Sequence, residues 1–128
     1  MLLVNNLSFN RGQKEIFKNL SISLPPKKII HLKGQNGIGK TTLIKILVSI
    51  LLPTTGDIYW NGKNIKKNLS EFFANLTYIM DTQTSKNELT VGENIQFWMK
   101  LFSSNIKLKQ LEGIYNLLSL DKYKNIQF

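Results

Sequence analysis

The stretch Gly34-Gln35-Asn36-Gly37-Ile38-Gly39-Lys40-Thr41-Thr42 decides how the rest of this sequence is interpreted. It fits the pattern G-x-x-x-x-G-K-[ST], in which the backbone N–H groups of a glycine-rich turn surround the phosphates of a nucleotide. The apolar run at 28–33 predicts a buried strand before the turn, and the apolar residues 43–52 predict a buried helix after it. A helix start supplies unpaired N–H groups and positive potential, so strand, turn and helix together predict a phosphate-binding site.

The residue types in this loop suit that chemistry. Lys40 is expected to reach the β- and γ-phosphates of ATP, and the Thr41 hydroxyl is expected to contact Mg²⁺. Glycine lets the backbone curl around phosphate oxygens without Cβ clashes. A chance match in a glycine-rich loop is the alternative, and the flanking strand and helix signals count against it. The predicted nucleotide-binding residues are Gly34, Gln35, Asn36, Gly37, Ile38, Gly39, Lys40, Thr41 and Thr42.

Composition narrows the class of protein. The chain has 128 residues and 42% hydrophobic residues, as expected for one globular domain. It has no cysteine and one histidine, so we expect neither a disulfide framework nor a thiolate or histidine metal site. The longest apolar run, 44–52, is too short to cross a bilayer, and residues 1–6 do not look like a signal peptide. These features predict a cytoplasmic protein.

The net charge of +9 is almost entirely lysine, with Arg11 as the only arginine. A basic chain can bind nucleic acid, an acidic membrane surface or an anionic ligand. Here the lysines are scattered along the sequence and are not interleaved with aromatic residues as in a nucleic-acid-binding stripe. We therefore expect no nucleic-acid partner.

Periodicity and turn residues order the remaining elements. Residues 2–9 predict a strand, 10–14 a turn, and 20–24 a second strand that ends at Pro25-Pro26, all before the phosphate loop. After the helix, 57–60 predict a strand, Asn61-Gly62 a tight turn, 70–73 a short helix and 76–80 an apolar strand. Thr90 and Glu93 have capping-box spacing at the start of a further helix, and 107–120 predict the last helix.

Four side chains outside the loop need an interpretation of their own. Trp60 is expected to pack on the sheet, and His31 to be a satisfied residue of the sheet. Trp98 and Phe102 share one helix face, which either core packing or a groove for a partner would explain.

Taken together, these segments resemble the nucleotide-binding domain of an ABC transporter. The matched pieces are the loop with its Asn36-Gly37 pair and Thr-Thr-Leu ending, the segment Pro53-Thr54-Thr55-Gly56-Asp57-Ile58, the turn Asn61-Gly62 and the helix start Leu89-Thr90-Val91-Gly92-Glu93-Asn94. Two strands before the loop also match, and the resemblance covers nearly the whole chain. Within this family, the chain is most similar to the ATP-binding subunit of the haem exporter used in cytochrome c maturation. The features that carry this similarity are the short loops, Arg11-Gly12, the stretch 58–62 and the stretch 86–90.

The resemblance implies an α/β fold of the P-loop NTPase type, with N-terminal antiparallel strands and part of the parallel core sheet. The family continues with a Leu-Ser-Gly-Gly-Gln signature, a Walker B strand and a switch histidine, and none of these lies within 1–128. We therefore expect one ABC-type ATP-binding domain over 1–128, present in its N-terminal part and truncated before the signature. The Walker B strand lies beside the phosphate-loop strand in the family, so the strand at 28–33 is expected to lack a ladder partner here.

The implied function is ATP binding in a transporter, coupled in the family to ATP hydrolysis and here most similar to haem export. The implied partners are membrane subunits and a second ATP-binding subunit, usually a second copy, at the cytoplasmic face of the inner membrane. Membrane contact is expected only through those subunits. A subunit of another ABC transporter, a small-molecule kinase and a non-hydrolysing remnant remain alternatives.

Two positions depart from the family pattern. The family often places an aromatic residue where Arg11 stands, so stacking of adenine on the Arg11 guanidinium is one possibility and loosely held adenine is the other. Gln83 is the candidate for the family's Gln-loop residue, which contacts Mg²⁺, although Asp81 and Thr82 could take that place.

Overall fold

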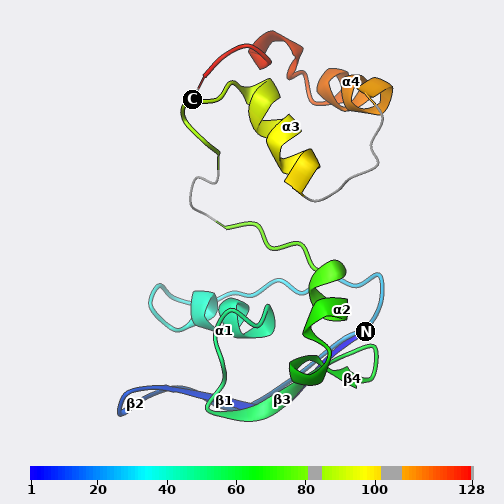
Figure 1. Ribbon diagram of the computed structural model, residues 1–128. Helices are drawn as coiled ribbons and strands as arrows, with labels where there is room; N and C mark the ends of the chain where they lie inside the picture. The colour runs from blue at the N-terminus through cyan, green and yellow to red at the C-terminus, as the bar shows by residue number, and fades with distance from the viewer. Residues whose placement is uncertain (81–84, 102–107, 128) are drawn as a thin grey trace. The chain divides into compact units, whose positions relative to one another are not determined.

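The computed structural model describes residues 1–80, 85–101 and 108–127. The chain forms two compact units, Met1–Ile79 and Met80–Phe128, and each is described here by itself (Figure 1). The expectation that residues 1–128 form the N-terminal part of one ABC-type ATP-binding domain stays a prediction.

The first unit holds four strands and two short α-helices. Its elements are β1 (Leu2–Arg11), β2 (Lys14–Leu24), α1 (Lys40–Leu47), β3 (Thr55–Trp60), β4 (Lys63–Asn64), the 3-10 turn η1 (Ile65–Lys67) and α2 (Leu69–Ala74). The second unit holds α3 (Val91–Leu101), α4 (Leu108–Leu117) and the 3-10 turn η2 (Asp121–Tyr123).

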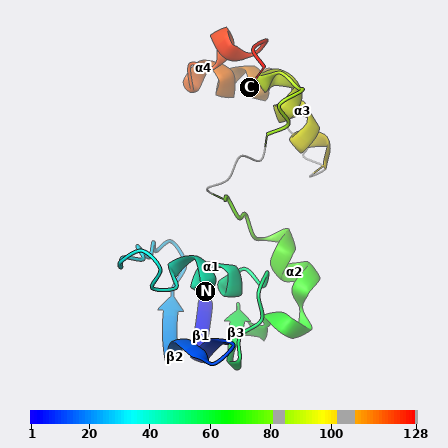
Figure 2. The ribbon, with the colours of Figure 1, turned by 90° about the vertical axis from the view of Figure 1, so that its left-hand side faces the viewer.

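The sheet of the first unit is antiparallel throughout, with strand order β2-β1-β3-β4. β1 lies between β2 and β3, so that Val4 is opposite Ile22 of β2 on one side and Ile58 of β3 on the other. Figure 2 shows β2, β1 and β3 side by side with α1 lying across the same face of all three. The two strands predicted before the phosphate loop and the strand predicted at 57–60 are therefore confirmed.

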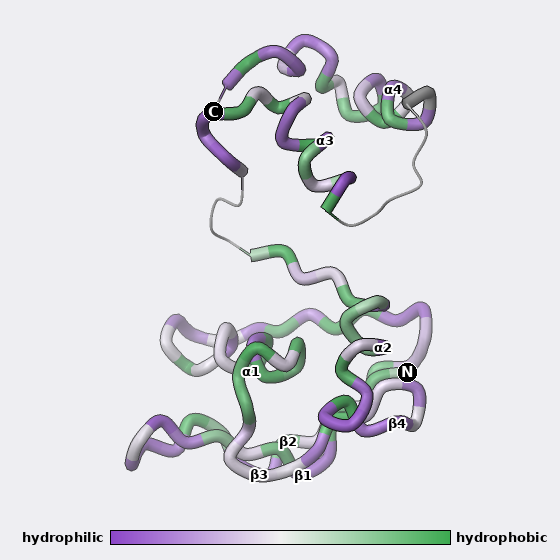
Figure 3. The backbone as a smooth tube through the Cα atoms, viewed as in Figure 1, coloured by the Kyte–Doolittle hydropathy of each residue, from purple (hydrophilic) through white to green (hydrophobic). Residues whose placement is uncertain are grey.

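The core of this unit forms where α1 and α2 meet the sheet. β1 contributes Val4, Leu7 and Phe9, and the irregular register between Val4 and Leu7 interrupts the strict alternation of a regular strand. Figure 3 shows apolar colour along α1 and the stretch that follows it, next to the sheet. The buried cluster consists of Val4, Leu7, Phe9, Leu43, Ile46, Ile58, Ile65 and Phe72.

Gly56 permits the close approach of β3 to β1. Its φ is +91°, and a Cβ at this position would lie 2.6 Å from the carbonyl oxygen of Asn6. No L side chain fits both that backbone conformation and that space. The Pro53-Thr54-Thr55-Gly56 stretch thus leads directly into β3, which packs closely against β1 at Gly56.

The turn and the short helix predicted after β3 are both present. Asn61 and Gly62 both have positive φ, 48° and 80°, and they connect β3 to β4. Trp60 packs on Phe72 of α2 with ring centroids 6.1 Å apart, so its assignment as a packing residue is confirmed.

The strands expected at 28–33 and 76–80 are not formed, and these two predictions were wrong. Ile29 is 95% exposed and Ile79 is 85% exposed. His31, expected inside the sheet, is exposed as well. An apolar run favours a strand, but a strand also needs a neighbour for its N–H and C=O groups. Among the described residues the sheet ends at β2 and β4, and neither segment has a ladder partner.

The helix after the phosphate loop is shorter and less enclosed than predicted. α1 ends at Leu47, and Ser49 takes the left-handed conformation (φ +61°). The N–H groups of Ile50 and Leu51 both donate to the carbonyl of Lys45, which closes the helix end. Leu43 and Ile46 are buried, but Ile44 is 38% exposed, because only one side of α1 contacts the sheet.

In the second unit, α3 begins with the predicted capping box. The Thr90 N–H and hydroxyl each donate to Glu93 at 2.8 Å, and the Glu93 N–H donates to the Thr90 hydroxyl at 3.3 Å. These hydrogen bonds lower the pKa of the exposed Glu93 carboxyl. The N–H groups of Val91 and Gly92 donate to carbonyls of Ile126 and Lys124, which fixes the end of the chain against the start of α3.

The last predicted helix is present as α4. Phe102 and the first residue of the predicted helix, Lys107, lie outside the described residues. Within the ranges that are described, no helix has the length and apolar character needed to cross a bilayer.

Candidate phosphate-binding site

A cavity of about 330 Å³ lies where the phosphate loop enters α1. β1 contributes one residue to its wall, the loop contributes three, and α1 and the segment after it contribute the rest. The lining residues are Arg11, Asn36, Gly37, Gly39, Lys40, Thr41, Thr42, Lys45 and Leu51. Most of the loop residues named by the sequence pattern are thus brought to one place, together with Arg11.

Gly39 sets the direction in which α1 leaves the loop. It occupies the N-cap position with φ +107°, and a Cβ there would lie 2.5 Å from Cγ2 of Ile16. The first intrahelical bond of α1 runs from the Leu43 N–H to the Gly39 carbonyl at 2.8 Å. The N–H groups of residues 40–42 therefore have no intrahelical partner, and no side chain caps them. This helix start is open to an anion.

Lys40 lies folded over the loop that precedes it. Its ammonium donates to the carbonyls of Gly34 at 2.7 Å and Gln35 at 2.8 Å. Both partners are neutral carbonyls, so phosphate oxygens of a nucleotide would offer the ammonium stronger, charge-assisted hydrogen bonds. The lysine is already positioned at the loop by hydrogen bonds local to residues 34–40.

Arg11 reaches the site from the end of β1. Its Nη2 donates to the hydroxyl of Thr42 at 3.3 Å, and Thr42 itself is 8% exposed. Together with Lys40 and Lys45 it gives the cavity three cationic side chains, and no described acidic residue lines it. This charge distribution favours a polyanionic ligand.

Thr41 is exposed, and its hydroxyl makes no hydrogen bond to any described residue. A free hydroxyl at the helix start fits Mg²⁺, which takes few protein ligands and is held mostly by water and substrate phosphates. No group of three His, Cys, Asp or Glu side chains suited to a metal exists among the described residues. Gln83, the other predicted Mg²⁺ contact, lies outside the described residues, as do its neighbours Asp81 and Thr82.

Two cavity residues were missed by the sequence pattern. Lys45 lies one turn after Thr41 on the same side of α1, and Leu51 follows the helix end. The i, i+4 spacing of Thr41 and Lys45 is the signal that could have identified the lysine.

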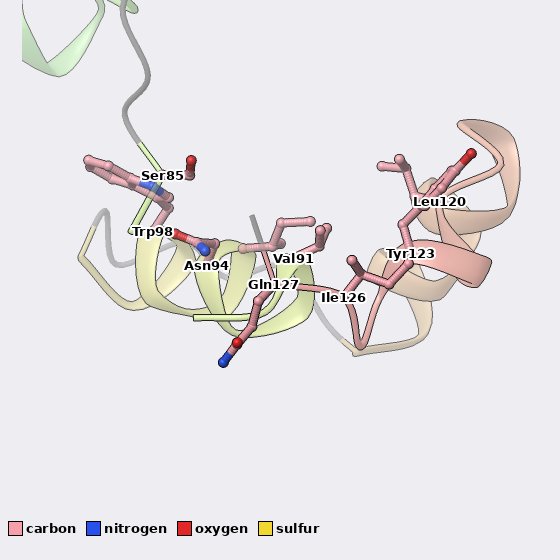
Figure 4. Close-up of a pocket in the computed structure, with 9 residues that line it drawn as sticks. Ser85, Val91, Asn94, Trp98, Leu120, Tyr123, Ile126 and Gln127 are labelled. Carbon is pink, nitrogen blue, oxygen red and sulfur yellow. The ribbon is translucent and has the colours of Figure 1, made fainter. Parts of the chain in front are cut away.

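A second cavity, of about 490 Å³, lies within the second unit and has a different character. Figure 4 shows its side chains projecting from α3 and from the stretch around η2. Asn94 is one of its few polar residues, and its amide already bonds to Lys86, Leu89 and Thr90. Trp98 is half-buried here, so it lines a cavity as well as packing on Phe97. The apolar lining residues are Val91, Ile95, Trp98, Leu120, Tyr123 and Ile126.

Comparison with known proteins decides the family. The model of the family described as ABC transporter matches residues 17–127. This chain belongs to the ABC transporter family. The match includes the phosphate loop and leaves out Arg11. The predicted resemblance to this family is confirmed.

Several similar curated proteins share one name. The cytochrome c biogenesis ATP-binding export protein CcmA of Rickettsia bellii is 38% identical over 104 residues, which cover 81% of this chain and 52% of that protein. CcmA of Haemophilus ducreyi is 34% identical over 100 residues, covering 78% of this chain and 48% of that protein. The chain thus spans about half the length of the curated relatives it matches.

Solved structures agree on the fold. An ATP-binding subunit of an ABC transporter superposes with a TM-score of 0.79 at 21% identity, covering 99% of this chain and 54% of that one. A dimeric ATP-binding cassette in a post-hydrolysis state with ADP and Pi gives a TM-score of 0.73 at 16% identity, over 99% and 61% of the two chains. At this identity the likeness shows the fold alone, and it confirms the predicted ABC ATPase fold class. The predicted part of the parallel core sheet is not formed among the described residues, because the apolar segments expected to supply it have no ladder partner and the sheet is antiparallel.

Proposed function

We propose that this chain binds Mg·ATP through residues 34–42 as the ATP-binding part of an ABC transporter. The observation that carries the proposal is the arrangement of the loop at the start of α1. Lys40 is held beside the loop carbonyls, and the uncapped N–H groups of residues 40–42 open into a cationic cavity. Every loop residue from Gly34 to Thr42 belongs to the proposed binding set, with Thr41 as the proposed Mg²⁺ contact.

The proposed role of the transporter is haem export for the biogenesis of c-type cytochromes. The support is the similarity of this chain to proteins named cytochrome c biogenesis ATP-binding export protein. The proposed partners are the membrane subunits of that transporter and a second ATP-binding subunit, since a related cassette is a dimer. The proposed location is the cytoplasmic face of the inner membrane, with contact through the membrane subunits.

ATP binding is tested by titrating the 128-residue chain with Mg·ATP in a calorimeter. A charged hydrogen bond contributes roughly 1.5–3 kcal/mol. Removing it by Lys40→Ala should therefore weaken binding roughly ten- to hundredfold. Lys14→Ala is the matched control, because Lys14 is exposed, lies outside the cavity and carries the same charge. Equal affinity of the wild type and Lys40→Ala would contradict the proposal.

For the 128-residue chain alone we propose binding with little hydrolysis. Phosphoryl transfer needs a positioned nucleophile and well-placed charge around the metal. The described cavity supplies cations and a hydroxyl but no carboxylate that could orient water. We expect phosphate release from ATP at the level of the Lys40→Ala variant. Release clearly above that level, measured with a coupled phosphate assay, would show that the chain hydrolyses ATP by itself.

A further inference from the structure

The cavity at the phosphate loop offers a nucleotide charge but no aromatic surface. None of its lining residues is Phe, Tyr, Trp or His. Phe9 is 9% exposed in the core and Phe17 packs on it with centroids 6.2 Å apart, so the aromatic rings near this end of the hairpin are engaged with each other. Recognition of a base normally uses a stacking ring or hydrogen bonds to the base edge. The described walls of this cavity favour recognition of phosphate.

The Arg11 guanidinium donates a hydrogen bond to the Thr42 hydroxyl. Thr42 belongs to the first turn of α1, the same turn whose N–H groups face the cavity, and it is nearly buried. The hydrogen bond at 3.3 Å brings Arg11 from the end of β1 to this turn. The guanidinium is therefore beside the proposed phosphate position and not free at the tip of the hairpin.

Arg11 also has unused capacity for a ligand. A guanidinium carries five N–H donors in a planar fork that suits phosphate oxygens. Ion pairs among the described residues join Lys18 to Glu15, Lys63 to Glu71 and Lys66 to Asp57, and none involves Arg11. Its charge is therefore not neutralised by a described carboxylate.

We propose that Arg11, positioned by Thr42, binds the phosphate chain of the nucleotide and makes the site select for phosphates and not for the base. This inference rests on the proposed nucleotide site, and it decides between the two sequence-based alternatives for Arg11. The site takes purine nucleoside triphosphates of either base, and linear polyphosphate competes for it.

The test titrates the 128-residue chain with Mg·ATP, Mg·GTP and Mg·tripolyphosphate. ATP and GTP should bind with affinities within about threefold of each other, since a missing base contact leaves little to discriminate them. Arg11→Ala should weaken all three ligands by the same factor, about tenfold for one charge-assisted contact at an accessible site. Arg11→Lys should keep most of the affinity, because it retains the charge.

Lys14→Ala is the control for charge alone. Lys14 pairs with Arg11 across the β1–β2 hairpin and is exposed, so it removes the same charge from the same turn without touching the cavity. It should change all three affinities by less than about twofold, as expected for a screened surface charge.

Thr42→Val tests the positioning. It removes the hydroxyl and keeps the shape of the side chain, so Arg11 loses its anchor. In the double variant with Arg11→Ala, the two losses should be clearly less than additive.

The outcomes separate the inference from the proposed function. If Arg11→Ala weakens ATP but leaves tripolyphosphate unchanged, Arg11 contacts the base and the inference is overturned while the phosphate site stands. A preference for ATP over GTP above tenfold overturns it equally. If neither nucleotide nor tripolyphosphate binds in a Lys40-dependent manner, the proposed function itself fails.

Discussion

Strand β3 and the segment 28–33 both carry apolar side chains next to a glycine turn, and their structures differ. β3 pairs with β1 on one side and β4 on the other, and its Ile58 is 3% exposed. Segment 28–33 pairs with no described residue, and its Ile29 is 95% exposed. An apolar run therefore specifies the capacity to form a strand, whereas its neighbours decide whether the strand exists.

The phosphate loop lies directly after the unpaired segment, yet its own hydrogen bonds do not depend on that segment. Lys40 bonds to the carbonyls of Gly34 and Gln35, and α1 begins from Gly39. α1 is held through Leu43 and Ile46, which pack in the core with the sheet residues. The candidate site therefore depends on β1 and α1, which are formed, and not on residues 28–33.

The largest expected effect contrasts the two isoleucines. Ile58→Ala removes a buried side chain from the core and should destabilise the fold by about 2–5 kcal/mol. Ile29→Ala changes a solvated side chain and should alter stability by less than about 0.5 kcal/mol. Urea unfolding followed by circular dichroism measures both. A large loss for Ile29→Ala would show that the segment 28–33 is packed in solution and would break the comparison.

A smaller effect concerns the start of α3, which is stabilised by hydrogen bonds between Thr90 and Glu93 and not by pairing with a distant strand. Thr90→Ala removes the capping box and should cost about 1 kcal/mol, measured as loss of helix signal on heating. Acid should act in the same direction. The hydrogen bonds from Thr90 lower the pKa of Glu93, so their stabilising effect is present above the unfolded-state pKa and is lost as the pH falls through the folded-state value. In Thr90→Ala this acid response should become smaller, because the hydroxyl contribution is lost while the backbone N–H of residue 90 still donates to Glu93. An unchanged response would assign it to other carboxylates.

The same contrast explains which parts of the fold could be predicted from the sequence. The Asn61-Gly62 turn, the Thr90–Glu93 box and the loop with Gly39 are encoded in a few adjacent residues, and all are found as expected. The strands at 28–33 and 76–80 required partners distant in sequence, and apolar content alone could not supply them.

The site was predictable to a similar extent. The loop pattern named the residues at the start of α1 because their spacing is a local property. The Arg11–Thr42 contact joins residues 31 positions apart, so no spacing rule could give it. The apolar cavity of the second unit depends on how the end of the chain returns to α3, which is also a long-range property.

The most direct test of the phosphate site is a titration of the ¹⁵N-labelled chain with Mg·ATP, followed by backbone amide chemical shifts. Binding at the loop predicts saturable shifts at Gly37, Gly39, Lys40 and Thr41. Mg·tripolyphosphate should reproduce these shifts, and Lys40→Ala should abolish them at the same ligand concentrations. Saturable shifts confined to residues 85–101 and 108–127, or none in the loop, would contradict the assignment of residues 34–42 as the nucleotide site.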